Sequence, residues 1–323
     1  TELANNYAKK ADLILAVGTR FEEEETAIWL DGEIFSVPPT KIIQIDINPI
    51  EIGKNYPVEL GLIGDAKLSL ASINKEIRDI LKEKPVKRGT KEELKSKKEE
   101  WFNKLKPFIN SDKKPINPRR LLYALNRYLP ENGIIVLDPS WARIGILQQF
   151  GSPGLDRCYI AGGVLPIGWS TASSLGVGVG RRDSRVISII GDGGFLMTIQ
   201  SLLTAKEYEL PITYIIINNK SYNALDVLQK VYFGKSIGSK FENPLSSEDV
   251  SPNYSEIAKA FHIPSRRVEE PNEIEEAIQE SLTQEGPFVL DLVSDPEGSK
   301  LIRSAPVTWS YFWSDLRKKR KQQ

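Results

Sequence analysis

The stretch IIGDGGFLMT, residues 189–198, begins as an apolar strand pattern, stops at Gly-Asp-Gly-Gly and passes straight into a helical pattern. A buried strand followed at once by a helix is the repeating unit of parallel α/β sheets. At the carboxyl end of such a strand, glycines let the backbone approach a ligand, and the N–H groups that follow favour a phosphate. The lone carboxylate of Asp192 therefore marks a candidate ligand site.

A second apolar strand pattern, ITYIIINN at residues 212–219, ends in two asparagines. Asn218 follows Gly193 after 24 intervening residues. Because parallel strands end at the same edge of a sheet, Asp192 and Asn219 can converge. Carboxylate and amide oxygens are hard ligands that suit Mg²⁺, which shares its coordination shell with substrate phosphates. The pair predicts a site that holds a metal-bridged diphosphate.

Strand and helix patterns alternate through the rest of the chain, which predicts an α/β protein with two doubly wound parallel-sheet domains. Within the second domain, a continuous helix is predicted over residues 195–209, after the glycines. The predicted divisions are a partial first domain, a basic linker with one exposed helix, a second domain and a tail, at residues 1–82, 83–114, 115–298 and 299–323.

Composition narrows the classes of partner. The 43 basic and 43 acidic residues give a net charge of zero, so no overall field favours nucleic acid or an acidic membrane surface. No apolar run reaches the 18 or so residues that span a bilayer. The single cysteine, Cys158, fits a reducing cytoplasm. Since the only methionine is Met197, we expect residues to precede Thr1 in a longer protein.

Two competing motifs are weak. GVGVG at residues 176–180 imitates a dinucleotide fingerprint, but it precedes a strand instead of following one, which favours simple helix packing. With one histidine, His262, and one cysteine, the chain offers neither a local zinc site nor a Cys-His pair.

The Gly-Asp-Gly and Asn-Asn pair at this spacing resembles the cofactor motif of the thiamine diphosphate enzymes. Three further stretches resemble the middle domain of their acetolactate synthase-like subgroup: ADLILAVGTRF, IIQIDINPIEIGKN and LIGDAKLSL. Residues from about 115 to 295 look like the diphosphate-binding domain of the same enzymes. The resemblance implies thiamine diphosphate and Mg²⁺ as cofactors.

The resemblance also implies a set of site residues. Asp192, Asn219 and the backbone carbonyl of Ser221 match the metal ligands. Ile167 matches the apolar wedge that bends the cofactor, and Leu165 would offer its backbone carbonyl to the pyrimidine ring. The remaining expected cofactor contacts are Ser140, Trp141, Gly191, Gly193 and Gly194. Four residues match positions that hold FAD in acetolactate synthases, although flavin-free relatives share the fold: Gly18, Arg20, Asp46 and Asp65.

The implied reaction is decarboxylation of a pyruvate-like 2-oxo acid and transfer of the acyl carbanion to a second 2-oxo acid. One departure is Leu228, which stands nine residues after Asn219 where biosynthetic acetolactate synthases place a tryptophan. A non-ligating decarboxylase of the benzoylformate type, or a cofactor-binding subunit inactive without its partner, is the alternative.

The activating glutamate of the family lies in a pyrimidine-binding domain that this sequence lacks. We expect an N-terminal segment or a partner chain to supply it, within a homodimer or tetramer.

Overall fold

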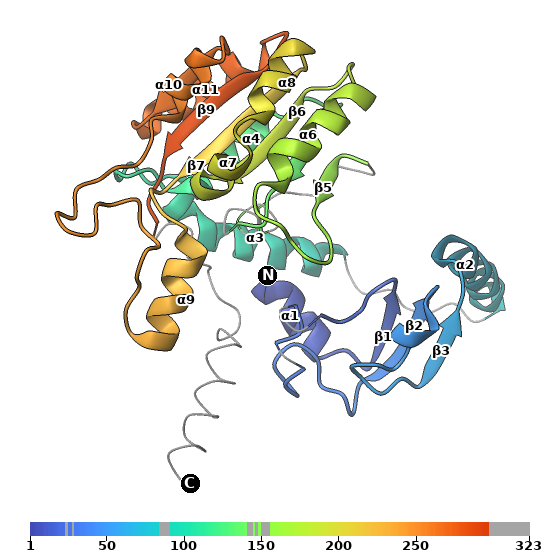
Figure 1. Cartoon of the computed structure of the whole chain (residues 1–323). Helices are drawn as coiled ribbons and strands as arrows, with labels where there is room; N and C mark the ends of the chain where they lie inside the picture. The colour runs from blue at the N-terminus through green and yellow to red at the C-terminus, as the bar shows by residue number, and fades with distance from the viewer. Residues whose placement is uncertain are drawn as a thin grey trace. The chain divides into compact units, whose positions relative to one another are not determined.

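The fold is described by a computed structural model that covers residues 1–22, 25–27, 29–83, 91–140, 145, 148–149 and 156–296 (Figure 1). These residues form two compact units that divide between Asn103 and Lys104. Trp141 and the predicted tail, residues 299–323, lie outside the described residues, as does part of the predicted linker. The domain limits at residues 82, 114 and 298 stay predictions.

The first unit contains a three-stranded parallel sheet in the order β1-β2-β3. Its strands and main helices are α1 (Glu2–Lys9), β1 (Leu13–Val17), β2 (Lys41–Asp46), β3 (Leu60–Ile63) and α2 (Ala66–Glu83). The small core combines Ala16 and Ile42 with an aromatic group. Phe21, Phe35 and Tyr56 meet edge to face in that group, with ring centroids 5.2–5.7 Å apart.

The helix α3 (Lys91–Ile109) occupies most of the predicted linker. Most of its residues are exposed, as expected, but Trp101 and Leu105 are buried. The stretch is therefore partly packed against the protein, which its high lysine content had concealed.

The second unit contains a six-stranded sheet in the order β5-β4-β6-β7-β9-β8, and every neighbouring pair is parallel. Its strands are β4 (Ile134–Leu137), β5 (Cys158–Ile160), β6 (Val186–Gly191), β7 (Ile212–Asn218), β8 (Ser265–Val268) and β9 (Phe288–Val293). Two parallel sheets therefore confirm the α/β prediction. The chain runs from β4 outward to β5 and then returns across the sheet to β6, so the carboxyl ends of β4 and β6 flank a switch in strand order.

Helices cover both faces of the larger sheet, as Figure 1 shows. One face packs on α4 (Pro118–Tyr128) and α11 (Ile274–Leu282), and the other on α6 (Trp169–Gly180), α7 (Asp192–Thr198), α8 (Ser201–Glu207) and α10 (Tyr254–Ala260). Alternate residues of a strand serve opposite faces, so Ile215 joins one core and Ile216 the other. This double burial explains why the central strands are almost wholly apolar.

Local signals in the sequence explain where α4 begins. Asn117 caps α4 by accepting a hydrogen bond from the Arg119 amide at 3.0 Å, and Pro118 takes the first helical position. The predicted continuous helix over residues 195–209 is wrong in its limits, because α7 already begins at Asp192 and a break at Ile199 and Gln200 separates α7 from α8.

GVGVG lies in α6, where a Cβ on Gly178 would contact Ile212 at 3.3 Å, so close helix packing is confirmed. Among the described helices, none combines the length and apolar character that a bilayer crossing requires.

Candidate functional site

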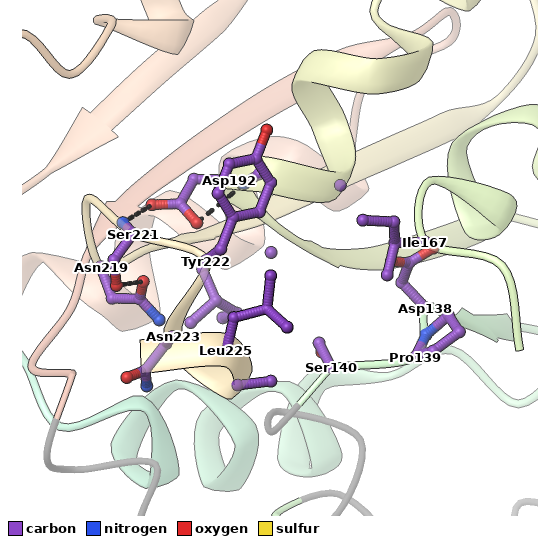
Figure 2. Close-up of a pocket in the computed structure, with 15 residues that line it drawn as sticks. Asp138, Pro139, Ser140, Ile167, Asp192, Asn219, Ser221, Tyr222, Asn223 and Leu225 are labelled. Atoms are coloured by element: carbon purple, nitrogen blue, oxygen red, sulfur yellow. Dashed lines mark hydrogen bonds between the residues drawn. The ribbon is translucent and has the colours of Figure 1, made fainter. Parts of the chain in front are cut away.

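A cavity of about 210 Å³ opens at the carboxyl ends of β4, β6 and β7 (Figure 2). It combines segments far apart in the chain because parallel strands deliver their following loops to one edge. In Figure 2, Asp192, Asn219 and Ser221 lie on one side and Asp138, Pro139 and Ile167 on the other. The lining also includes Ser140, Gly191, Gly193, Gly194, Ile217, Tyr222, Asn223, Ala224 and Leu225.

Asp192 is the most deeply buried polar residue that lines the cavity, with 1% of its surface exposed. Its Oδ1 accepts a hydrogen bond from the Gly193 amide at 2.9 Å, and its Oδ2 accepts one from the Ser221 amide at 3.1 Å. Burial raises the pKa of Asp192 to about 7, although these backbone amides oppose the shift. Because burial outweighs these hydrogen bonds, a nearby cation would stabilise the carboxylate as an anion.

The metal loop, which we define as residues 219–222, follows β7 and brings two further predicted ligands to the cavity. Ser221 donates a hydrogen bond from its hydroxyl to Asn219 Oδ1 at 3.0 Å, which orients that amide. The link from the Ser221 amide to Asp192 joins this loop directly to the start of α7. One carboxylate, one amide oxygen and one backbone carbonyl form a donor set that suits Mg²⁺, which usually retains water and phosphate oxygens as further ligands.

Other features of the cavity fit a diphosphate. Ser140 Oγ is buried in the wall and has no hydrogen-bond partner among the residues that the structure describes. Gly194 is buried and so closely packed that a Cβ there would approach Asp138 Oδ2 to 2.8 Å, so this point of the wall requires a glycine. An unpartnered hydroxyl in the same cavity wall as a carboxylate-amide pair is suited to phosphate oxygens and their cation.

Ile167 offers the cavity a large apolar surface, 42% exposed, on the turn before α6. The next residue, Gly168, has a φ of +86°, and a Cβ there would contact the Gly194 carbonyl oxygen at 3.0 Å. The turn is held by Asp138, whose two carboxylate oxygens accept from the Gly168 amide at 3.1 Å and the Ser170 amide at 3.0 Å. A buried carboxylate at the end of β4 thus supports the turn that carries Ile167.

The structure therefore brings eight of the ten predicted cofactor contacts to one cavity. Leu165 has a φ of +52° but does not line the cavity, and Trp141 lies outside the described residues. Leu228, the residue that replaces the expected tryptophan, is half-buried in α9 (Asn223–Phe233) and does not line the cavity either. The roles assigned to all of these residues remain proposals.

The four candidate flavin residues lie at or after the carboxyl ends of the strands of the smaller sheet. Gly18 follows β1 with a φ of +61°, and Asp46 ends β2. Asp65 immediately precedes α2, and its Oδ1 accepts a hydrogen bond from the Leu68 amide at 2.9 Å. Arg20 forms an ion pair with Glu22. Shared position at one sheet edge is consistent with a ligand site, but the side chains of Arg20, Asp46 and Asp65 each have a local partner.

Sequence reasoning missed two lining residues that matter for the geometry. Asp138 ends the pattern IIVLD, an apolar strand that stops at a carboxylate as the strand before Asp192 does, so a signal was present. Tyr222 gave no comparable signal, because its place beside Asp192 depends on the tertiary fold (Figure 2).

Comparison with known proteins agrees with this geometry. Residues 1–73 match the central domain of thiamine pyrophosphate enzymes, and residues 144–292 match their C-terminal TPP-binding domain. The chain is 31% identical over 309 residues to a probable acetolactate synthase large subunit of Methanococcus aeolicus, covering 93% of this chain and 50% of the relative.

Two more relatives are similar over nearly the same part of the chain. A probable acetolactate synthase large subunit of Methanocaldococcus jannaschii is 31% identical over 92% of this chain and 48% of its own length. Acetolactate synthase 1 of Zea mays, a chloroplastic protein, is 28% identical over 91% of this chain and 45% of its own length. The chain thus spans about half the length of the curated relatives it matches. With both domain types matched and their sheets observed, the chain belongs to the thiamine pyrophosphate enzymes, of which it carries the central domain and the C-terminal TPP-binding domain.

Proposed function

We propose that this chain forms part of an enzyme that uses thiamine diphosphate and Mg²⁺ to decarboxylate a pyruvate-like 2-oxo acid and to transfer the acyl group to a second 2-oxo acid. The observation that carries the proposal is the 3.1 Å hydrogen bond between the Ser221 amide and Asp192 Oδ2, which brings the two metal-binding segments together. The names of the relatives, all acetolactate synthases or probable large subunits, support the carboligase form of the reaction.

In this proposal the chain's own residues bind and orient. Asp192, Asn219 and the Ser221 carbonyl hold Mg²⁺, while Ser140 and the backbone at Gly191, Gly193 and Gly194 contact the diphosphate. Ile167 would pack against the rings of the cofactor, and Leu165 would offer its backbone carbonyl to the pyrimidine. Thiamine diphosphate, when bound, supplies the electron sink that decarboxylation of a 2-oxo acid needs.

Binding is the first test. Thiamine diphosphate should bind the assembled enzyme in calorimetry when Mg²⁺ is present and should lose most of its affinity when the metal is chelated. Binding that is indifferent to Mg²⁺ would remove the basis of the proposed site.

Product analysis is the second test, because it separates the carboligase from a simple decarboxylase. The enzyme is incubated with pyruvate alone and then with pyruvate and 2-oxobutanoate, and acetolactate, acetohydroxybutyrate and acetaldehyde are quantified. By the family resemblance, position 228 belongs to the acceptor side of a complete site, although Leu228 does not line the cavity described above. Because leucine there is smaller than tryptophan, we expect only a weak preference for 2-oxobutanoate as acceptor; apolar pockets discriminate one methylene by about 1–3 kcal/mol. Acetaldehyde as the main product in both mixtures would favour the decarboxylase.

A pyrimidine-binding domain must complete the site in this proposal, supplied by a further segment or by a partner chain in a dimer or tetramer. The isolated 323-residue chain should therefore turn over no 2-oxo acid. Robust decarboxylation by this chain alone would show that the site is self-contained. Flavin binding through Gly18, Arg20, Asp46 and Asp65 is tested by the absorbance spectrum of the purified protein, which shows flavin bands only if FAD is retained.

A further inference from the structure

Asp291 is a buried carboxylate that lies behind the candidate metal site and does not line its cavity. It belongs to β9, beside both β7 and β8, and none of its surface is exposed. Three donors from three different elements converge on it: Asn218 Nδ2 at 2.9 Å, Arg267 Nη1 at 2.7 Å and the Tyr254 amide at 3.1 Å. A buried charge is costly unless it is paired and hydrogen-bonded, and here all three contacts meet that need.

The first contact controls the start of the metal loop. A carboxylate only accepts hydrogen bonds, so it fixes the Asn218 side chain with its NH₂ group toward Asp291. The amide oxygen of Asn218 is then turned toward the Lys220 amide, from which it accepts at 3.3 Å. Lys220 has a φ of +60°, an unfavourable conformation for a residue with a side chain, so this turn needs such support.

The contact with Tyr254 reaches the other side of the site, at the start of α7. Asp291 holds the backbone of Tyr254 at the start of α10, and the Tyr254 hydroxyl donates to the backbone oxygen of Asp192 at 3.3 Å. The tyrosine ring is fully buried and meets Phe195 edge to face, with centroids 5.7 Å apart. Because Phe195 lies on α7 with Asp192, the ring and the hydroxyl both fix the start of that helix.

We propose that Asp291 is a positioning residue that sets the separation between Asp192 and the metal loop. The inference rests on the proposed Mg²⁺ and thiamine diphosphate site. The Asp291 carboxylate supports both the start of α7, which carries Asp192, and the metal loop, while Arg267 supplies the compensating charge. Mg²⁺ requires near-octahedral geometry with ligands at 2.0–2.1 Å, whereas Ca²⁺ accepts longer and more variable distances. A change in the separation between Asp192 and the metal loop should therefore weaken Mg²⁺ binding more than Ca²⁺ binding.

The test replaces Asp291 by asparagine in the assembled enzyme and measures thiamine diphosphate binding by calorimetry against increasing Mg²⁺ or Ca²⁺. In Asp291→Asn, the new NH₂ group is a donor that faces other donors and cannot accept their hydrogen bonds, so at least one of the three contacts is lost. We expect the Mg²⁺ concentration for half-maximal binding to rise by about 10-fold, the low end of the effect of removing a group that contacts a metal ligand directly, because Asp291 acts on the ligands through Asn218 and Tyr254. The Ca²⁺ requirement should rise less.

Two further variants separate positioning from general destabilisation. Tyr254→Phe keeps the ring but removes the bond to the Asp192 carbonyl, and it should shift the Mg²⁺ requirement in the same direction by a smaller factor. Thr213→Val is the matched control at the opposite end of β7: it also removes two buried hydrogen bonds, from Arg185 Nε at 2.9 Å and to the Ser281 carbonyl at 3.0 Å. Its Mg²⁺ requirement should stay at the wild-type value.

The outcomes distinguish the two proposals. If the wild-type enzyme binds thiamine diphosphate without any need for Mg²⁺, both the proposed function and this inference fall. If the wild-type enzyme needs Mg²⁺ but Asp291→Asn and Tyr254→Phe need no more of it, the positioning role alone is overturned. An equal shift for Mg²⁺ and Ca²⁺ that Thr213→Val reproduces would also overturn it, since that pattern reports only loss of stability.

Discussion

The ring of Tyr222 lies directly against Gly193, so a Cβ added to Gly193 would stand 2.4 Å from Tyr222 Cε1. The ring has little freedom to withdraw. Its backbone amide donates to the Ser239 carbonyl at 2.7 Å, and Phe241 packs edge to face against it at 5.2 Å. Direct contact between the loop after β7 and the first turn of α7 therefore depends on the absence of a side chain at Gly193.

The first prediction follows from this contact. Gly193→Ala should lower the free energy of unfolding by about 1–3 kcal/mol, the usual cost of overpacking. Introduced into a Tyr222→Ala background, the same change should cost clearly less, so the two effects should not add. Urea unfolding of the four proteins of this cycle measures the coupling.

Gly176→Ala is the control for that cycle. Gly176 also lies in a helix, but a Cβ there would meet nothing within 4 Å, so the change should be neutral or stabilising. Additive effects of Gly193→Ala and Tyr222→Ala on the free energy of unfolding would show that the two residues are not coupled.

The second prediction concerns the proposed metal ligand. Asp192→Ala should abolish Mg²⁺-dependent binding of thiamine diphosphate, because the diphosphate would lose its bridging cation. Calorimetry with and without Mg²⁺ measures this in the assembled enzyme. Asp183→Ala, which removes an exposed carboxylate near the opposite end of β6, should leave binding unchanged. Metal-dependent binding that persists in Asp192→Ala would exclude Asp192 as a ligand.

The third prediction concerns the support beneath Ile167. In Asp138→Asn, one of the two backbone amides now bound by the carboxylate would face an NH₂ group. Leaving a buried donor unsatisfied costs about 1–3 kcal/mol, so the free energy of unfolding should fall by that amount. Affinity for thiamine diphosphate should fall as well, since the turn that carries Ile167 loses a support. Unchanged affinity despite lower stability would show that Asp138 only stabilises the fold.

The fourth prediction concerns pH. Burial alone would raise the pKa of Asp226, but hydrogen bonds from Lys230, Ser236 and Ser239 outweigh it, so the pKa lies below the ordinary value. A lowered folded-state pKa contributes stability above the unfolded value of about 3.9, and this contribution is lost as the pH falls through the folded value. Wild type should therefore exceed Asp226→Asn in free energy of unfolding at pH 7, and the gap should narrow below about pH 4.

Urea unfolding of both proteins across that range measures the gap. A difference that stays constant down to the acid limit would mean that Asp226 contributes through packing and not through its charge.

Much of the candidate site could be predicted because it lies at strand ends. Asp192 and Asn219 each follow a continuous apolar run, and parallel pairing of β6 and β7 brings the ends of such runs together. This convergence could be predicted from the shared direction of the two strands, whereas most of the other site residues were predicted only from the family resemblance. The start of α7 was misjudged by three residues because two glycines concealed a helical turn that tertiary contacts stabilise.

The supporting residues could not be predicted in the same way. Asp291 is one carboxylate within an otherwise apolar strand, and nothing near it in the chain indicates its partners at Asn218, Tyr254 and Arg267. These contacts exist only after β7, β8 and β9 have paired, so they are a property of the tertiary fold. Local patterns identify ligands more readily than the residues that hold them in place.

The two central strands, VISIIG and ITYIIIN, are uncharged, rich in β-branched residues and adjacent in the sheet. Segments of this composition aggregate readily when a protein opens or folds slowly. The candidate cofactor site lies at the ends of these same strands, and any ligand that binds only the folded form lowers the population of the open one by mass action. Under the proposed function, cofactor supply and protein yield should therefore be coupled: protein produced under thiamine starvation should be the material most exposed to misassembly into insoluble aggregates.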